Sequence, residues 1–135
     1  MPKPLIHAAI GLIIHNGRCL ISKRRKGSHQ GGLWEFPGGK FLPGEPAETC
    51  LHREVREETG MGVTIEEAFP VIEHVYPERT VRLYFFRCTP EKKDETLPSG
   101  SRARWVPLKE IDRYAFPEAN KPILKLLRNY SWGES

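Results

Sequence analysis

The sequence predicts a protein of the α/β (α+β) class, in which helices pack on the faces of a mixed β-sheet. Three observations predict this class. Several β-branched or alternating segments are bounded by glycine and proline turns, a longer segment has no interior glycine or proline, and an amphipathic segment follows near the end. Strands and helices interleaved in this way are typical of a sheet covered by helices. With 135 residues, 39% of them hydrophobic, the chain is expected to form one domain, residues 1–135.

The chain is expected to begin with a β-hairpin. Residues 5–14 and 18–23 are rich in aliphatic and β-branched residues. Asn16 and Gly17 lie between them, and this pair favours a two-residue hairpin turn because both positions tolerate positive φ.

A short apolar segment and a helix are expected next. Residues 33–36 are followed by Gly38 and Gly39, which predict a tight turn. Residues 46–59 predict a helix, since the segment begins with a proline, which suits a first helical turn. Gly60 stands where a C-cap belongs.

The second half of the chain is expected to be mostly sheet, closed by one more helix. Alternating and β-branched residues predict further strands at residues 63–65, 71–76, 80–88 and 103–106. The polar segment 90–102 is interpreted as an exposed loop. Apolar residues at helical spacing predict an amphipathic helix over 118–130.

Composition and charge narrow the possible partners and location. The net charge of +4 and the pI near 9.1 are compatible with an anionic partner, but they do not distinguish a polymer from a single nucleotide. The three cysteines are widely spaced and match no zinc pattern, which favours a reducing, cytoplasmic location. The apolar stretch 8–14 is far shorter than the ~20 residues of a membrane span, so no membrane association is expected.

The helix predicted over 46–59 carries a stripe that is apolar at its start and acidic at its end. The stripe consists of Ala47, Cys50, Leu51, Glu54, Glu57 and Glu58. Its carboxylates repel one another, and they lie near a helix C-terminus, where the macrodipole disfavours negative charge. A cation should offset them. The alternative is a solvent-exposed face in which Arg53 and Arg56 form ion pairs with the glutamates.

Residues around this helix favour a site for a hard cation. The backbone carbonyl at Gly39 can approach an ion, and Glu45 can bind the first-turn amides of the helix or orient Arg53. Carboxylate and carbonyl oxygens suit Mg²⁺, with Mn²⁺ as a substitute, and such ions are usually completed by water and substrate phosphates. The expected substrate is therefore a phosphate ester or anhydride.

The same residues resemble a known family motif. Gly39, five residues, Glu45, seven residues and the segment 53–61 together are similar to a complete Nudix box, with every fixed position filled. The resemblance implies an α/β/α sandwich around a mixed sheet. It also implies that the Gly39 carbonyl and the side chains of Glu54, Glu57 and Glu58 bind the metal.

The resemblance further implies a Nudix hydrolase in which water attacks a phosphorus of a polyphosphate, with Arg53 and the three glutamates as catalytic residues. Glu54 is one candidate for the base that deprotonates the water. Some relatives use a glutamate from a later loop, but Arg104 stands where the MutT-type pattern can carry it. The remaining candidates are the loop carboxylates Glu91, Asp94 and Glu95.

Three segments outside the box resemble MutT-type members of the family, at residues 33–40, 76–79 and 116–122. This implies that Asn120 recognises the edge of an oxidised guanine, because an amide can both donate and accept. On residue type alone, Asn120 could equally be a helix N-cap. The remaining nucleotide-binding residues implied by the resemblance are Arg24, His29, Phe36 and Arg79.

The expected function is therefore Mg²⁺-dependent hydrolysis of 8-oxo-dGTP to 8-oxo-dGMP and pyrophosphate. The alternatives are a Nudix pyrophosphohydrolase for another nucleotide such as CTP or dCTP, and a non-catalytic nucleotide- or nucleic-acid-binding domain. The expected partner is a nucleoside triphosphate. We expect no stable complex with nucleic acid, and of the possible oligomeric states we favour a monomer.

Overall fold

The computed structural model describes residues 2–24, 32–92, 97 and 101–129. The strands in these ranges are β1 (Leu5–His15), β2 (Arg18–Lys23), β3 (Trp34–Glu35), β4 (Gly38–Lys40), β5 (Val63–Ala68), β6 (Ile72–Val75), β7 (Thr80–Pro90) and β8 (Ala103–Pro107). The helices are α1 (Ala47–Thr59), α2 (Lys121–Asn129) and the 3₁₀ helices η1 (Leu108–Arg113) and η2 (Glu118–Asn120). No described helix is long and apolar enough to cross a membrane.

The strands form a mixed sheet built around β1. The strand order is β3-β2-β1-β7-β5, with β4 on β1, β6 on β7 and β8 on β2. β1 and β7 are parallel over a long register, from Leu5 opposite Thr80 to Ile13 opposite Cys88. The other strand pairs are antiparallel.

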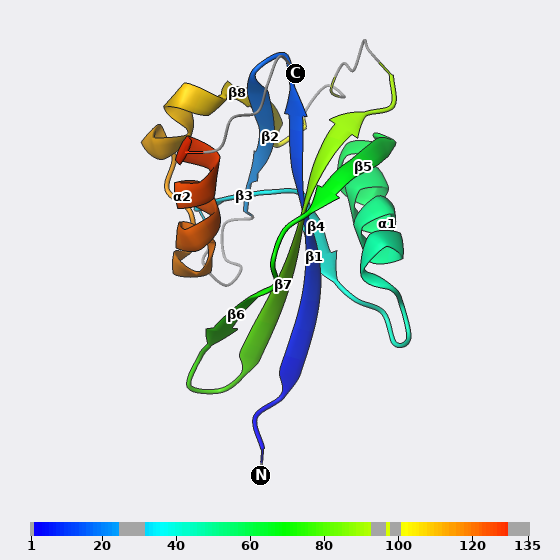
Figure 1. The fold of residues 1–135 in the computed structure, drawn as a ribbon, viewed down its shortest axis with the longest axis vertical. Coiled ribbons are helices and arrows are strands. Elements are labelled where there is room, and N and C mark those ends of the chain that lie inside the picture. The colour runs from blue at the N-terminus through cyan, green and yellow to red at the C-terminus, as the bar shows by residue number, and fades with distance from the viewer. Residues whose placement is uncertain (1, 25–31, 93–96, 98–100, 130–135) are drawn as a thin grey trace.

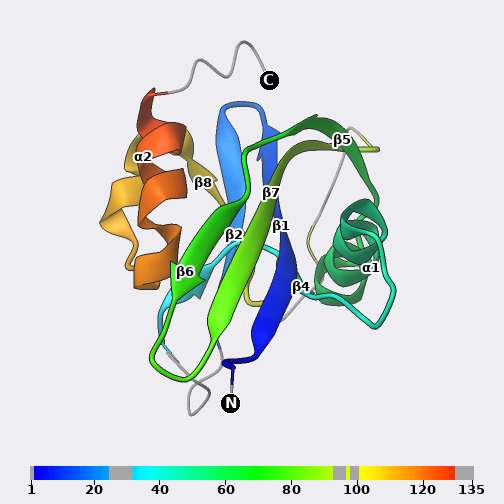
Figure 2. The same ribbon diagram turned by 60° about the horizontal axis from the view of Figure 1, so that its bottom comes forward.

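The helices cover both faces of this sheet, with α1 on one side and α2 on the other (Figures 1 and 2). Along β1, Leu12 and Ile14 belong to the core that also holds α2, whereas Ala9 and Ile13 belong to the core that holds α1. Successive side chains of a strand point to opposite faces, so a strand covered on both faces needs a continuous apolar run. The predicted α/β/α arrangement is confirmed.

The predicted hairpin and first helix are also confirmed. Asn16 and Gly17 have φ values of 52° and 72°, as a tight hairpin turn requires. Helix α1 begins one residue later than predicted, because Pro46 is its N-cap in extended conformation. Gly60 ends the helix in the left-handed conformation, with φ of 73°, and its amide donates to the carbonyl of Arg56 at 2.8 Å.

The tight turn predicted at Gly38 and Gly39 is wrong, since both residues belong to strand β4. This strand pairs with β1, with Gly39 opposite Ala9. A side chain at Gly38 would collide with the Ala9 carbonyl, so this glycine permits close approach of two backbones.

The helix predicted over 118–130 is divided in the structure. It begins as the 3₁₀ turn η2, and α2 starts only at Lys121. Pro122 explains this division, because proline has no amide hydrogen and is tolerated in the first turn of an α-helix but not in its interior. Helix η1 was not predicted, and it contributes the fully buried Ile111 to the core on the α2 side.

Candidate active site

Helix α1 is anchored to the sheet by its apolar side and carries its glutamates along the flank. The buried side consists of Cys50, Leu51, Val55 and Thr59. The side chain of Glu54 is only 18% exposed, whereas that of Glu57 is 58% exposed. The acidic residues therefore lie beside the buried stripe. The sequence pattern had predicted that they continue it.

Arg53 connects these glutamates to the loop that precedes the helix. Its Nε and Nη2 atoms each donate to Glu45 at 2.9 Å. Its Nη1 atom donates to Glu54 at 2.9 Å and to Glu57 at 3.4 Å. Glu45 therefore orients Arg53. It also accepts from the Leu42 amide at 3.0 Å and lies within hydrogen-bonding reach of the Cys50 thiol.

This ion-pair network fixes the charge states of its central members. The guanidinium of Arg53 and the Leu42 amide lower the pKa of Glu45 to about 2. The hydrogen bonds that Arg53 donates to the carboxylates, above all the one to Glu45, raise the pKa of Arg53 above its ordinary value. Both groups are thus fully ionised. Of the ion pairs expected as an alternative, those of Arg53 are present, whereas Arg56 forms no ion pair with a described residue. Arg53 holds the glutamates by these ion pairs, and its catalytic role stays a prediction.

Strand β4 lies directly against the glutamates of α1. The Gly38 amide donates to Glu58 at 3.2 Å, and a side chain at Gly39 would collide with the Glu54 carboxylate. Although Glu58 is an exposed residue, protein atoms around its carboxyl group displace water and raise its pKa to about 8, and the charges of Glu35 and Glu54 add to this rise. In this arrangement the cluster has more carboxylates than it can hold ionised.

The donor set fits a hard divalent cation in its chemistry. Glu54, Glu57, Glu58 and the Gly39 carbonyl supply only oxygen, and the missing side chain at Gly39 leaves the approach open. Within the described ranges, no three His, Cys, Asp or Glu side chains are gathered closely enough to hold a metal ion. Arg53 spans Glu54 and Glu57 in this conformation, so the glutamates have to turn toward a cation to bind it.

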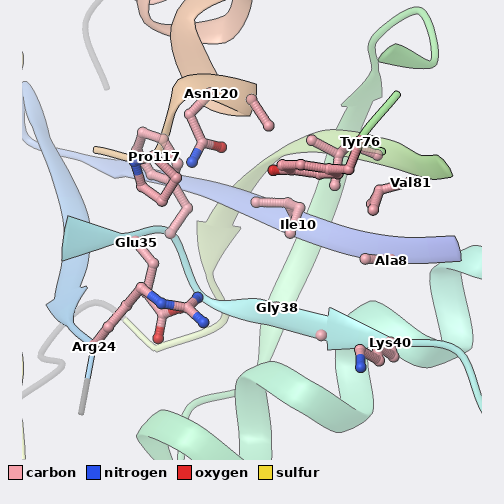
Figure 3. Close-up of a pocket in the computed structure, with 14 residues that line it drawn as sticks. Ala8, Ile10, Arg24, Glu35, Gly38, Lys40, Tyr76, Val81, Pro117 and Asn120 are labelled. Atoms are coloured by element: carbon pink, nitrogen blue, oxygen red, sulfur yellow. The ribbon is translucent and has the colours of Figure 1, made fainter. Parts of the chain in front are cut away.

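A pocket of about 250 Å³ opens on the other side of β4 (Figure 3). Asn120 and Tyr76 lie on one side of this pocket, and Gly38, Arg24 and Glu35 lie on the other. Gly38 and Gly39 belong both to its lining and to the contact with the glutamates. The pocket and the acidic flank of α1 therefore share β4 as a common wall.

Arg24, Phe36 and Asn120, three of the residues predicted to bind the nucleotide, line this pocket. Phe36 is only 3% exposed and stacks on Phe116 with ring centroids 4.8 Å apart. Arg24 forms an ion pair with Glu35 at 2.6 Å.

Two predicted nucleotide-binding residues are not found in the pocket lining. The guanidinium of Arg79 is 5.1 Å from the centre of the Tyr76 ring, outside the lining itself. His29 lies outside the described residues.

Three pocket residues with a polar or ionisable side chain were missed as candidate site residues. Lys40 follows the two glycines of β4. Tyr76 belongs to the matched segment 76–79, in which only Arg79 was assigned a role. The third is Glu35. A signal for it existed, because a carboxylate between two aromatic residues in a short apolar segment is unusual unless it has a partner.

The other positions considered for the base lie in β8, at the end of β7 or outside the described residues. Arg104 is exposed in β8 and packs its guanidinium 4.9 Å from the centre of the Trp34 ring. Glu91 is at the end of β7, where its amide donates to the Gly62 carbonyl at 3.0 Å. Asp94 and Glu95 lie outside the described residues. The Glu54 carboxylate lies directly against Gly39, beside the other expected metal ligands.

All three cysteines are free and buried. The Cys50 thiol lies beneath β4, where it donates to the carbonyls of Gly39 at 3.3 Å and Lys40 at 3.4 Å. Burial, together with the charge of Glu45, raises the pKa of Cys50 to about 11, so the thiol is protonated.

Comparisons with known proteins agree with this arrangement. A family model described as a NUDIX domain matches residues 9–126. The 8-oxo-dGTP diphosphatase of Proteus vulgaris is 41% identical over 103 residues, which cover 75% of this chain and 91% of that protein. The CTP pyrophosphohydrolase of Escherichia coli strain K12 is 28% identical over 121 residues, which cover 90% of each protein. The crystal structure of the MutT protein from Methanosarcina mazei Go1 superimposes with a TM-score of 0.78 at 26% identity, covering 95% of this chain and 96% of that one.

The match to the family model extends over most of the chain and includes the whole acidic helix. It decides against the non-catalytic binding domain that the sequence left open, because the related proteins are pyrophosphohydrolases that act on small nucleotides. Nudix hydrolases generally depend on a divalent metal, in keeping with the oxygen donors of α1 and β4. The chain belongs to the NUDIX domain family and is a Nudix hydrolase.

Proposed function

We propose that this Nudix hydrolase converts 8-oxo-dGTP to 8-oxo-dGMP and pyrophosphate in an Mg²⁺-dependent reaction, and so removes a mutagenic nucleotide from the pool. One observation carries the proposal: β4 has the Asn120 pocket on one side and the glutamates of α1 on the other. A nucleotide whose base occupies the pocket would extend its phosphates past Gly38 and Gly39 toward the glutamates. The activity named for the Proteus vulgaris relative supports the same substrate.

The Asn120 amide is the proposed reader of the base. Its side chain lines the pocket, and no described residue hydrogen-bonds it there. Guanine has a bare N7 acceptor, whereas the 8-oxo base carries a proton at N7 beside the O6 acceptor. An amide presents an acceptor and a donor side by side, which matches the oxidised edge and leaves one pair unmade with the normal edge. Phe36 and Tyr76 contribute the apolar surface against which a flat base packs.

The proposed metal ligands are the Gly39 carbonyl and the side chains of Glu54, Glu57 and Glu58. When bound, Mg²⁺ neutralises charge on the phosphate oxygens and makes phosphorus a better electrophile. Glu54 is the proposed base, and Arg53 orients its carboxylate through a hydrogen bond to Oε1 at 2.9 Å. Lys40, exposed beside Gly39, supplies a positive charge along the path of the phosphates.

The direct test is pyrophosphate release from a panel of nucleoside triphosphates at low concentration, with and without Mg²⁺. The panel contains 8-oxo-dGTP, dGTP, CTP and dCTP. Mg²⁺-dependent release with the highest kcat/KM for 8-oxo-dGTP is the expected result. A higher kcat/KM for any other nucleotide would refute the substrate assignment and keep the hydrolase chemistry.

CTP or dCTP is the competing substrate, because the CTP pyrophosphohydrolase of Escherichia coli is similar over 90% of the chain. A pyrimidine has no N7 edge for Asn120 to recognise, so the asparagine should then matter little for selectivity. The expected monomer, its cytoplasmic location and the absence of a stable nucleic-acid complex remain predictions of the sequence.

A further inference from the structure

Cys50 joins helix α1 to the strand that would present the backbone ligand. It is fully buried, and its Sγ atom lies 3.3 Å from the Gly39 oxygen and 3.4 Å from the Lys40 oxygen. The thiol can donate its hydrogen to either carbonyl, and the Glu45 carboxylate is a third acceptor within its reach. The helix thereby contacts the end of β4 through a polar group at a position where an apolar side chain would suffice for packing.

The other two cysteines show that this contact is not a general property of buried thiols in this chain. The Cys19 thiol approaches the carbonyl of the next residue, Leu20, at 3.9 Å. The Cys88 thiol approaches the Phe86 carbonyl of its own strand at 3.7 Å. Of the three cysteines, Cys50 makes the shortest contacts and is the one whose thiol bridges two elements.

A second side chain of α1 holds the same corner from the solvent side. Arg53, three residues after Cys50, donates from Nη2 to the Lys40 carbonyl at 3.2 Å. Residues three apart on a helix lie on the same face, so the two donors reach the β4 backbone together. The Lys40 carbonyl is held by both donors, and the Gly39 carbonyl is held by Cys50.

We propose that Cys50 is a positioning residue whose thiol orients the Gly39 carbonyl for binding a divalent cation. The thiol holds this carbonyl from the helix side, and Ala9 of β1 lies opposite Gly39 in the strand pair. The inference rests on the proposed function, because it requires the Gly39 oxygen to be a metal ligand. It adds a residue of the buried helix side, outside the glutamates, to the determinants of metal affinity.

The test compares variants at Cys50 that separate hydrogen bonding from packing. Cys50→Ser keeps a donor, Cys50→Val fills the space without one, and Cys50→Ala removes the donor without adding bulk. Cys88→Val is the matched control, because Cys88 is a buried cysteine of the same core whose thiol approaches a carbonyl of its own strand. The measurement is the dissociation constant of Mn²⁺ for the full chain without nucleotide, by electron paramagnetic resonance titration, with a thermal midpoint for each variant.

Loss of one hydrogen bond of ordinary strength should weaken Mn²⁺ binding about threefold to tenfold in Cys50→Val and Cys50→Ala. Cys50→Ser should stay within about twofold of the wild type, since its hydroxyl is also a donor. Cys88→Val should change the thermal midpoint without changing the dissociation constant. This pattern would support the proposal even if every variant lost some stability.

Two results would overturn it. If Cys50→Val bound Mn²⁺ like the wild type while Cys50→Ser bound weakly, the residue would serve packing alone. If all Cys50 variants bound like the wild type, the thiol would have no influence on the carbonyl. Failure of the wild type itself to bind Mn²⁺ would instead refute the metal site of the proposed function, and with it the premise of this inference.

Discussion

Replacing Gly39 by alanine tests the site at the point where β4 meets the glutamates. Gly39 does not require a positive φ, so alanine adopts its backbone conformation without strain. The new Cβ atom, however, would lie 2.5 Å from Glu54 Oε2 and 2.7 Å from Oε1. The Glu54 Cδ atom would be nearest, at 2.4 Å. Ordinary contact begins at 3.4 Å, so the carboxylate has to move by about 0.7–1.0 Å.

A displacement of about 1 Å in a catalytic group can lower turnover about 100-fold, which corresponds to about 2.7 kcal/mol of transition-state stabilisation. Gly39→Ala should therefore reduce kcat by about two orders of magnitude and weaken Mn²⁺ binding, while the thermal midpoint changes little. The fold is preserved because a flexible side chain, not backbone, yields to the new atom. The assays are steady-state pyrophosphate release and Mn²⁺ titration on the same preparation.

Gly62→Ala is the matched control, because its Cβ atom would also meet a glutamate carboxylate, that of Glu91 at 3.0 Å. Its turnover should equal that of the wild type, since Glu91 lies at the far end of β7 and is not the proposed base. Wild-type kcat and Mn²⁺ affinity in Gly39→Ala would refute the roles given to Glu54 and β4. A large loss in Gly62→Ala would identify Glu91 as a participant.

Three further predictions follow from the same geometry. Glu57→Gln should lower kcat at least 100-fold with an unchanged thermal midpoint, because the exposed side chain contributes to metal binding more than to packing; wild-type turnover in this variant would remove Glu57 from the metal site. Asn120→Ala should reduce the kcat/KM ratio of 8-oxo-dGTP to dGTP about tenfold, through loss of a differential hydrogen bond, and an unchanged ratio would contradict base reading by Asn120. Because the folded-state pKa of Glu58 is raised to about 8, the proton on Glu58 favours the metal-free fold below pH 4.5, and this contribution is lost as the pH rises through 8. The thermal midpoint of metal-free protein should fall more between pH 5 and 8 in the wild type than in Glu58→Gln, and Mg²⁺ should reverse the fall; parallel curves for the two proteins would contradict the raised pKa.

The acidic half of the site could be predicted because its residues are close in the sequence. A helix has a fixed period, so the spacing from Arg53 to Glu58 already determines which side chains share a flank. The expected link between Glu45 and Arg53 is present at 2.9 Å for the same reason, since only Pro46 and the first turns of α1 separate them. The sequence pattern could not show that Val55 and Thr59, rather than the glutamates, continue the buried stripe. That outcome depends on how the helix is rotated against the sheet.

The nucleotide pocket was harder to predict because its walls come from distant segments. Tyr76 and Asn120 are 44 positions apart in the chain, and the pairing of Glu35 with Arg24 depends on the register of β3 against β2. Register is set by the whole sheet, and a shift of one residue would turn Glu35 to the opposite face. The turn expected at Gly38 was wrong because this glycine permits close contact between β4 and β1. A contact between distant segments is not visible in a local sequence pattern.

The shared wall between pocket and glutamates also bears on how recognition and chemistry are connected. Strand β4 spans three residues, and its Gly38 amide binds Glu58 while its glycines line the pocket. A base that seats poorly against Gly38 would therefore displace the backbone that positions both the Gly39 carbonyl and the Glu58 carboxylate. Discrimination between nucleotides should then appear in kcat as well as in KM, because misplacement reaches the reacting groups through one short strand. Were the two sides independent, a poor base would raise KM alone.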